Sequence, residues 1–207
     1  MGYTFAKKRT TKDQLIKVLT ITQDLKSNRF KKRNISVAKQ HIEQIVVLPN
    51  EVFSFWKVVG NPTKKRGFVN SRSIVQGKTT ESIGGGLCQL SGLLYLGSIH
   101  CGLEIIERHN HSVDIYTEET RYMPLGGDAT VAFGYKDLKI KNNLKHPISF
   151  QITLEEDTVT IDVLHAMKLD IKKIDFKLHK ENENRKEVKT FANEQLIETS
   201  IYKNLKY

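Results

Sequence analysis

The sequence has few cysteines and prolines and no long apolar segment. Two cysteines and four prolines occur among its 207 residues. Cys88 and Cys101 lie thirteen residues apart in one predicted helix, which separates them by roughly 20 Å at about 1.5 Å per residue. A disulfide between them is therefore excluded, and with it the class of small secreted domains that are built on disulfides.

A membrane-spanning segment is also missing, because no run of about 18 apolar residues occurs anywhere. The first residues, Met1 to Lys8, contain no apolar core of signal-peptide length. As written, the chain is expected to be cytoplasmic. If it is a piece of a longer product, an association with the cell envelope is expected instead.

Acidic residues are scarce relative to basic ones. The chain has 33 Lys and Arg against 23 Asp and Glu, a formal net charge of +10, which favours anionic partners such as nucleic acid, anionic lipid or an anionic cell-wall polymer. Many basic residues fall within the first 33, and the run from Ser27 to Arg33 indicates a solvated basic linker. Aromatic residues are not interleaved with these cations, so the pattern does not favour a nucleic-acid module.

The apolar pattern predicts helices first and strands afterwards. A helix is expected over residues 10–26, a second one from Asn34 or Ser36 to about Val46, and a central helix with one buried face from Leu87 to Cys101, which Gly102 ends. Alternating residues then predict strands over 103–108, 112–116, 128–134, 137–141, 148–153 and 159–163. The predicted fold is α/β (α+β), with these helices packed on a mostly antiparallel sheet.

Three glycines stand directly before the central helix, and Cys88 follows them in its first turn. Glycines at this place let the free backbone N–H groups approach an anion closely, and the helix N-terminus favours the thiolate form of the cysteine. Cys88 is thus a candidate nucleophile, with Gly85 and Gly86 as candidates for binding an oxyanion. The alternative is a tight turn followed by a cysteine that acts as a small buried hydrophobe.

An imidazole and a carboxylate follow the thiol along the chain. Thiol catalysis needs a histidine near the thiol and a third group that orients the ring. His109 and His111 are both available, and His111 is favoured as the base because it opens a predicted strand, with Asp128 as its orienter. The order of helix-borne cysteine, histidine and aspartate resembles papain-like and transglutaminase-like proteins. The alternative is a histidine that a backbone carbonyl satisfies within a hairpin.

Three neighbouring residues complete the predicted site. Gln89, Arg108 and His109 are candidates for substrate binding, although Arg108 could equally pair with Glu107 or Asp114. No Cys-x-x-Cys or His-x-x-x-His spacing supports a metal site, and the glycines lack the Lys-Ser/Thr ending of a phosphate-binding loop. No metal or cofactor is expected.

Five motifs resemble one known family. They are Pro49-Asn50-Glu51-Val52-Phe53-Ser54-Phe55, Gly84 to Ser91, Gly102 to Ser112, Pro124 to Val131, and Asp137 to Asn143. In this order, over roughly residues 34–152, they are similar to the VanW family. The resemblance implies an association with glycopeptide (vancomycin) resistance or with the cell wall, where relatives are often envelope proteins joined to modules assigned to peptidoglycan binding. It implies no particular reaction.

The resemblance completes the predicted organisation. Residues 1–33 are expected to form a basic N-terminal helix and linker, residues 34–165 a VanW-like domain, and residues 166–207 a C-terminal β-rich or partner-binding extension. The expected function is a Cys-His-Asp hydrolase or acyl-transferase that acts on peptidoglycan or its precursors. The alternative is a non-catalytic module that binds peptidoglycan, a peptide or another anionic ligand.

Overall fold

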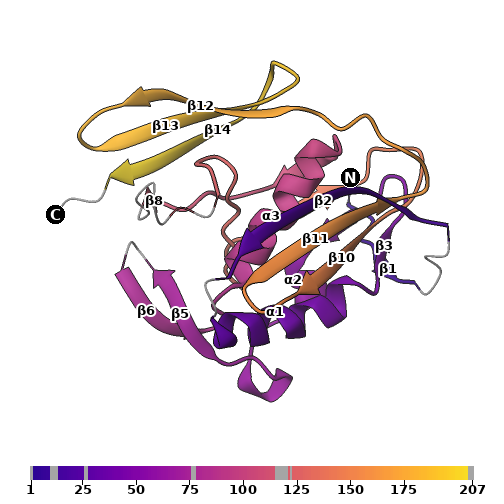
Figure 1. The fold of residues 1–207 in the computed structure, drawn as a ribbon, viewed down its shortest axis with the longest axis horizontal. Coiled ribbons are helices and arrows are strands. Elements are labelled where there is room, and N and C mark those ends of the chain that lie inside the picture. Colours follow the sequence, from indigo (N-terminus) through magenta and orange to yellow (C-terminus); the bar gives the residue numbers. More distant parts are fainter. Residues whose placement is uncertain are drawn as a thin grey trace.

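An antiparallel sheet of five strands forms the base of the fold (Figure 1). In this computed structural model, the described residues are 2–9, 14–25, 28–75, 78–114, 121 and 123–204. The strands run in the order β1-β3-β10-β11-β2, which are Lys7–Lys8, Ile45–Val47, Ile148–Leu154, Thr158–His165 and Ile16–Asp24. Segments from both ends of the family-like region therefore share one sheet.

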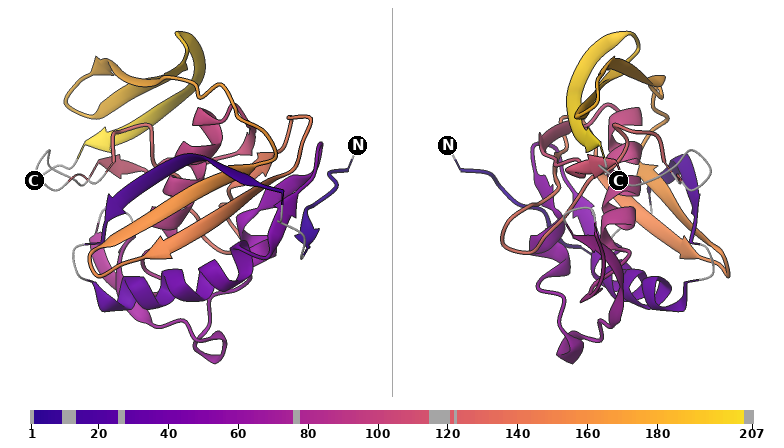
Figure 2. Two further views of the ribbon diagram at one scale, coloured as in Figure 1. Left: turned by 45° about the vertical axis from the view of Figure 1, so that its right-hand side comes forward. Right: turned by 90° about the vertical axis from the view of Figure 1, so that its left-hand side faces the viewer.

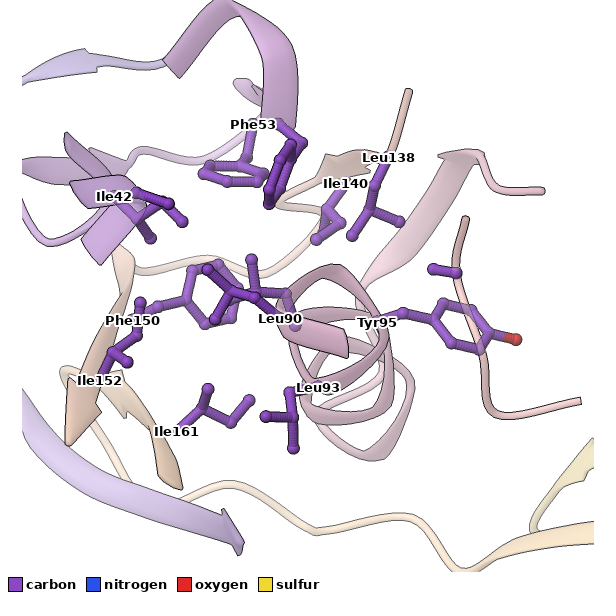
Figure 3. Packing of buried hydrophobic residues seen from close by; sticks show 14 of the residues in the cluster. Ile42, Phe53, Leu90, Leu93, Tyr95, Leu138, Ile140, Phe150, Ile152 and Ile161 are labelled. Atoms are coloured by element: carbon purple, nitrogen blue, oxygen red, sulfur yellow. The ribbon is translucent and has the colours of Figure 1, made fainter. Parts of the chain in front are cut away.

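Helix α3 (Leu87–His100) packs on this sheet and is the centre of the apolar core. All its residues except Cys88 and His100 are buried, so the expectation of a single buried face was wrong. A Cβ atom on Gly97 would lie 2.8 Å from Ile161 Cδ1, and the missing side chain lets the helix approach the sheet closely. Figure 3 shows Leu93 directed toward Ile161, with Tyr95 on the opposite side of the helix.

Smaller elements surround this core. Helix α1 (Arg29–Ile42) lies below α3 in Figure 1. A second sheet has the order β4-β9-β7, and a hairpin pairs β5 with β6. The strands of the second sheet are β4 (Val52–Ser54), β9 (Lys139–Lys141) and β7 (Glu104–Glu107). The hairpin consists of β5 (Asn70–Val75) and β6 (Lys78–Ile83). Between β4 and β5, the chain forms α2 (Phe55–Val59) and the 3-10 helix η1 (Lys64–Arg66).

The C-terminal part of the chain forms a separate sheet in the order β12-β13-β14-β8. It joins Ile174–Glu181, Arg185–Ala192 and Gln195–Asn204 to the short strand Val113–Asp114, and this last strand runs parallel to β14. Both views of Figure 2 place β12 to β14 on the opposite side of α3 from α1. The C-terminal segment thus packs on the part of the chain that lies between α3 and β9 in the sequence, and it does not project into solvent.

The α+β class is confirmed, but the predicted helix over residues 10–26 is wrong where the structure describes it. Ile16–Asp24 is strand β2, paired with β11 at the edge of the large sheet. Five of its nine residues are β-branched, which favours an extended backbone over the helix that the apolar spacing indicated. Residues 10–13 and 26 of this prediction lie outside the described residues.

Other predicted bounds also need correction. Helix α1 begins at Arg29, because the Asn28 side chain accepts a hydrogen bond from the Lys31 amide at 3.0 Å. Most of the predicted basic linker is therefore helix, and β3 replaces the predicted helix end. Residues 128–134 form a loop that contains one bridge, Ala132 to Lys136, instead of a strand. Of the strand predicted over 112–116, only β8 is found, and residues 115–116 lie outside the described part.

The cysteine and membrane predictions agree with the structure. Cys88 and Cys101 are both free thiols. Within the described ranges, no helix has the length and apolar character that a membrane crossing requires. The domain boundaries proposed after residues 33 and 165 stay predictions.

The contact of α3 with the sheet leads to a stability prediction. Leu93 is 0% exposed, and Leu93→Ala leaves a cavity that should lower the free energy of unfolding by about 2–5 kcal/mol. The same substitution at Leu178, which is 55% exposed on β12, should change it by less than about 0.5 kcal/mol. Urea denaturation of both variants measures the difference, and equal losses would contradict the central role of α3.

Candidate functional site

Cys88 is the second residue of α3, at the end of the glycine turn. Gly86, the N-cap, has a φ of 98°, and a Cβ atom there would lie 3.1 Å from Lys31 Cβ of α1. Only glycine combines this backbone with so close an approach. Asn34 of α1 fixes the same turn by donating to the Gly85 carbonyl at 3.0 Å. Cys88 is half-buried, with its Sγ 3.6 Å from the carbonyl oxygen of Val131.

His111 connects this thiol to Asp128. Its Nδ1 lies 2.6 Å from Asp128 Oδ2, and the same carboxylate oxygen accepts the His111 backbone N–H at 2.7 Å. The Cys88 thiol is near enough to the imidazole to raise its pKa. Asp128 engages Nδ1, which leaves the other ring nitrogen available. Cys88, His111 and Asp128, which the sequence predicted as a group, are thus neighbours in the fold, and their catalytic roles stay predictions.

The charges of this group perturb two pKa values. Burial disfavours a charged imidazole, but the hydrogen bond to Asp128 and the interaction with Cys88 outweigh it and raise the pKa of His111 to about 10. Burial likewise opposes ionisation of Asp128, yet the hydrogen bond from His111 and the charge of Arg108 lower its pKa to about 2. A charged imidazolium–carboxylate pair is the form that this environment favours at neutral pH.

Arg108 holds Asp128 from the other side. Its Nη2 donates to Asp128 Oδ1 and to the Gly126 carbonyl, each at 3.0 Å, and its Nε donates to the Asp128 carbonyl at 2.7 Å. The guanidinium also lies 5.0 Å from the centre of the Tyr95 ring of α3. The Arg108 side chain thus lies inside the protein and fixes the position of the Asp128 carboxylate.

The other predicted binding residues lie around the helix start. Gln89 is buried, and its Nε2 donates to the Asp24 carbonyl of β2 at 2.8 Å. His109 is engaged elsewhere, with its Nε2 3.0 Å from a carboxylate oxygen of Glu107. His111 is the histidine whose pKa Cys88 affects. Substrate-binding roles for Gly85, Gly86, Gln89, Arg108 and His109 stay predictions.

Two residues of β14, Tyr202 and Ser200, complete the site. Neither was predicted from the sequence. The buried Tyr202 hydroxyl donates to Asp128 Oδ1 at 2.5 Å and accepts the Gly126 N–H at 2.7 Å. Ser200 accepts a hydrogen bond from Arg108 Nη1. The two residues are two positions apart in one strand, so they lie on the same face. This spacing indicates a buried face but does not show which loop covers it.

The surroundings of the site are tightly filled. A small pocket of about 20 Å³, lined by His111, Asp128 and Tyr202 among others, lies beside the imidazole. That volume suits about one water molecule. Among the residues that the structure describes, no group of three or more His, Cys, Asp or Glu side chains is arranged to hold a metal ion.

The structural class of this protein is an α+β fold that carries a thiol at the start of a helix, an imidazole and a buried carboxylate. The family follows from its sequence, since residues 30–164 match the family model described as VanW like protein. The chain therefore belongs to the VanW family.

Two curated relatives each match more than half of this chain. The uncharacterized protein YoaR of Bacillus subtilis is 39% identical over 122 residues, which are 59% of this chain and 39% of the relative. The vancomycin B-type resistance protein VanW of Enterococcus faecalis is 32% identical over 126 residues, 61% of this chain and 46% of the relative. The matched region thus spans less than half of either relative. No solved structure matches significantly, so the papain-like or transglutaminase-like order stays a prediction.

Tyr202 provides a test of how the C-terminal sheet supports Asp128. Tyr202→Phe removes a hydrogen bond to a buried charge and should lower the free energy of unfolding by about 1.5–3 kcal/mol. Tyr135→Phe is the control, because Tyr135 is 90% exposed and should change stability by less than about 0.5 kcal/mol. Chemical denaturation measures both, and an unchanged Tyr202→Phe variant would show that the hydroxyl does not support the site.

The raised pKa of His111 predicts a pH-dependent stability. The folded-state value, about 10, lies above the ordinary 6.5, so the contribution is fully present below pH 6.5 and is lost as pH rises toward 10. The contribution of the ionised Asp128 to stability is lost as pH falls from 3.8 toward 2. The stability difference between wild type and His111→Gln should therefore be largest between about pH 4 and 6.5. NMR titration of the imidazole nitrogens gives the direct measurement, and a midpoint near 6.5 in the folded wild type would contradict it.

Proposed function

We propose that this protein is a cell-wall enzyme that uses Cys88 to break or transfer an acyl bond of peptidoglycan or its precursors. One observation supports this reaction above all, namely that the His111 imidazole hydrogen-bonds to Asp128 and is near enough to the Cys88 thiol for that thiol to raise its pKa. Thiol catalysis requires this arrangement, because the imidazole exchanges a proton with the thiol and the carboxylate fixes the orientation of the ring.

The electrostatics favour a protonated imidazole. A raised pKa keeps His111 protonated at neutral pH, and in the proposed reaction Cys88 acts as the thiolate, the nucleophilic form of a cysteine. In the resting enzyme, His111 then holds the proton that a leaving amine needs. Asp128 stabilises that protonated ring through Nδ1 and does not take the proton itself.

The reaction then has two balanced steps. The Cys88 thiolate attacks the acyl carbon of an amide, a C–S bond forms, the C–N bond breaks, and the leaving amine takes the proton from His111. In the second step, neutral His111 removes a proton from water or from an acceptor amine, which attacks the thioester and releases the Cys88 thiolate. Water as the acceptor gives hydrolysis, and an amine gives acyl transfer.

The choice of peptidoglycan rests on the family and on charge. The relative from E. faecalis is named a vancomycin B-type resistance protein, and the resemblance to the VanW family implies an association with the cell wall. The net charge of +10 is compatible with anionic wall components. Peptide amides of peptidoglycan or its precursors combine this setting with the acyl chemistry of a thiol.

A second function, binding without catalysis, is favoured by how little room surrounds the sulfur. Cys88 Sγ contacts the Val131 carbonyl, and the pocket beside His111 has room for about one water. Gln89 and Arg108 direct donors at protein atoms. In this version the protein is a scaffolding or binding module for peptidoglycan or a peptide, and the charged pair is structural.

The two cysteines allow a matched experiment. Cys101 is 4% exposed, and burial raises the pKa of its thiol to about 12, so iodoacetamide should modify Cys88 and leave Cys101 unmodified. With purified peptidoglycan as substrate, Cys88→Ala should lower the release or transfer of peptides by a factor of about 10³ or more. Cys101→Ala should retain activity, and mass spectrometry detects both products and the Cys88 thioester.

Unchanged activity of Cys88→Ala would overturn the catalytic proposal. If the wild type releases no peptide and Cys88→Ser binds peptidoglycan as tightly as the wild type does, the binding module is supported instead. Sedimentation of the full chain with insoluble peptidoglycan measures that affinity.

A further inference from the structure

Helix α1 carries a cationic surface that the proposed chemistry does not use. Two stretches of the sequence, residues 25–42 and 52–80, contain six Lys or Arg each and no Asp or Glu. Their twelve positive charges exceed the net charge of the whole chain, which is +10. The positive charge is therefore concentrated in these two stretches, while the remaining residues are close to neutral.

The fold places the two stretches side by side. Asn34 of α1 donates to the Val69 carbonyl at 3.1 Å, and its side-chain oxygen accepts the Val69 N–H at 2.8 Å. Arg33 Nε donates to the Gly67 carbonyl at 3.3 Å. These bonds hold the N-terminal half of α1 against η1 and the start of β5, so cations that are distant in sequence share one surface.

Two grooves follow the flanks of α1. One, of about 660 Å³, lies between α1 and the η1–β5 segment and is lined by Arg33 and Lys64. The other, of about 510 Å³, lies between α1 and the end of β10 and is lined by Arg29, Lys32, Arg33 and Lys39. Among the described residues that line them, neither groove has an acidic side chain. Lys39 pairs with Glu43 at 3.7 Å, whereas Arg29, Lys32 and Lys64 form no ion pair with the described residues.

The shape and composition of this surface select among anionic partners. Grooves on two sides of a helix accommodate a flexible chain, whereas a lipid bilayer presents a plane. Phe30 is the exposed large aromatic residue beside the cations, and the Arg29 guanidinium lies 4.8 Å from its ring centre. A stack of nucleic-acid bases would need free aromatic faces. A linear polyanion without bases fits these features.

We propose that the α1 surface binds a polyol-phosphate polymer, a chain of glycerol or ribitol units joined by phosphodiesters, of the kind found in cell walls. Arg29, Lys32, Arg33 and Lys64 supply the charges that neutralise successive phosphates. This binding is separate from the Cys88 chemistry, and the two are tested by different variants. Cys88→Ser should bind the polymer as tightly as the wild type.

The test is the binding of the full chain to a fluorescently labelled poly(glycerol phosphate), followed by anisotropy. If these four side chains neutralise about four phosphates, raising the salt from 50 to 200 mM should weaken binding about fiftyfold. Arg29→Gln, Lys32→Gln and Lys64→Gln combined should weaken binding at 100 mM salt at least about tenfold and reduce the salt slope by about two.

A matched control removes the same charge elsewhere. Lys145, Lys168 and Lys180 are exposed and line neither groove, so Lys145→Gln, Lys168→Gln and Lys180→Gln combined should bind like the wild type. Equal weakening of the two triple variants would overturn the proposal, because it would show an effect of net charge alone. Tighter binding of single-stranded RNA, or of vesicles containing anionic lipid, would also overturn it.

Discussion

The buried carboxylate of Asp128 is the interaction on which the site and the C-terminal sheet both depend. Asp128 is 6% exposed and accepts hydrogen bonds from Arg108, His111 and Tyr202. Burying a charge costs several kcal/mol unless partners compensate for the lost water, so these donors act together. They come from the loops around β8 and from β14, so one anion adds to the pairing of β8 with β14 in connecting these segments.

The local part of this arrangement was predictable from the sequence. The glycine turn and the leucines after it indicated α3, and the order of Cys88, His111 and Asp128 indicated a group that the structure brings together. Residues 16–24 were assigned wrongly, because an edge strand with one partly covered face shows weak alternation and imitates helical spacing. Tyr202 was missed because its partner is 74 residues away, and no local pattern indicates such a contact.

The fold also separates two kinds of surface around α3. On one side, α1 covers the core and presents cations that are spread over grooves. On the other, the C-terminal sheet lies beyond α3 (Figure 2). Tyr202 of that sheet contacts Asp128, and the pocket beside this carboxylate measures only about 20 Å³. Charges that face solvent are screened by salt, and many of them together can bind a long partner weakly. Charges enclosed by protein interact strongly and fix one protonation state. The first turn of α3 lies between them, with Lys31 against Gly86 and His111 against Cys88.

The position of Tyr202 on the last strand sets a time at which the site can assemble. At about 5–20 residues per second, a ribosome needs about 4–15 s to extend the chain from Asp128 to Tyr202. Until then the glycine turn, the thiol and the imidazole already exist, but the carboxylate lacks a donor and the cover of β14. A nascent chain is therefore not expected to hold a fully ordered Cys88 group before β14 leaves the ribosome, which delays any thiol reactivity until that strand has been made.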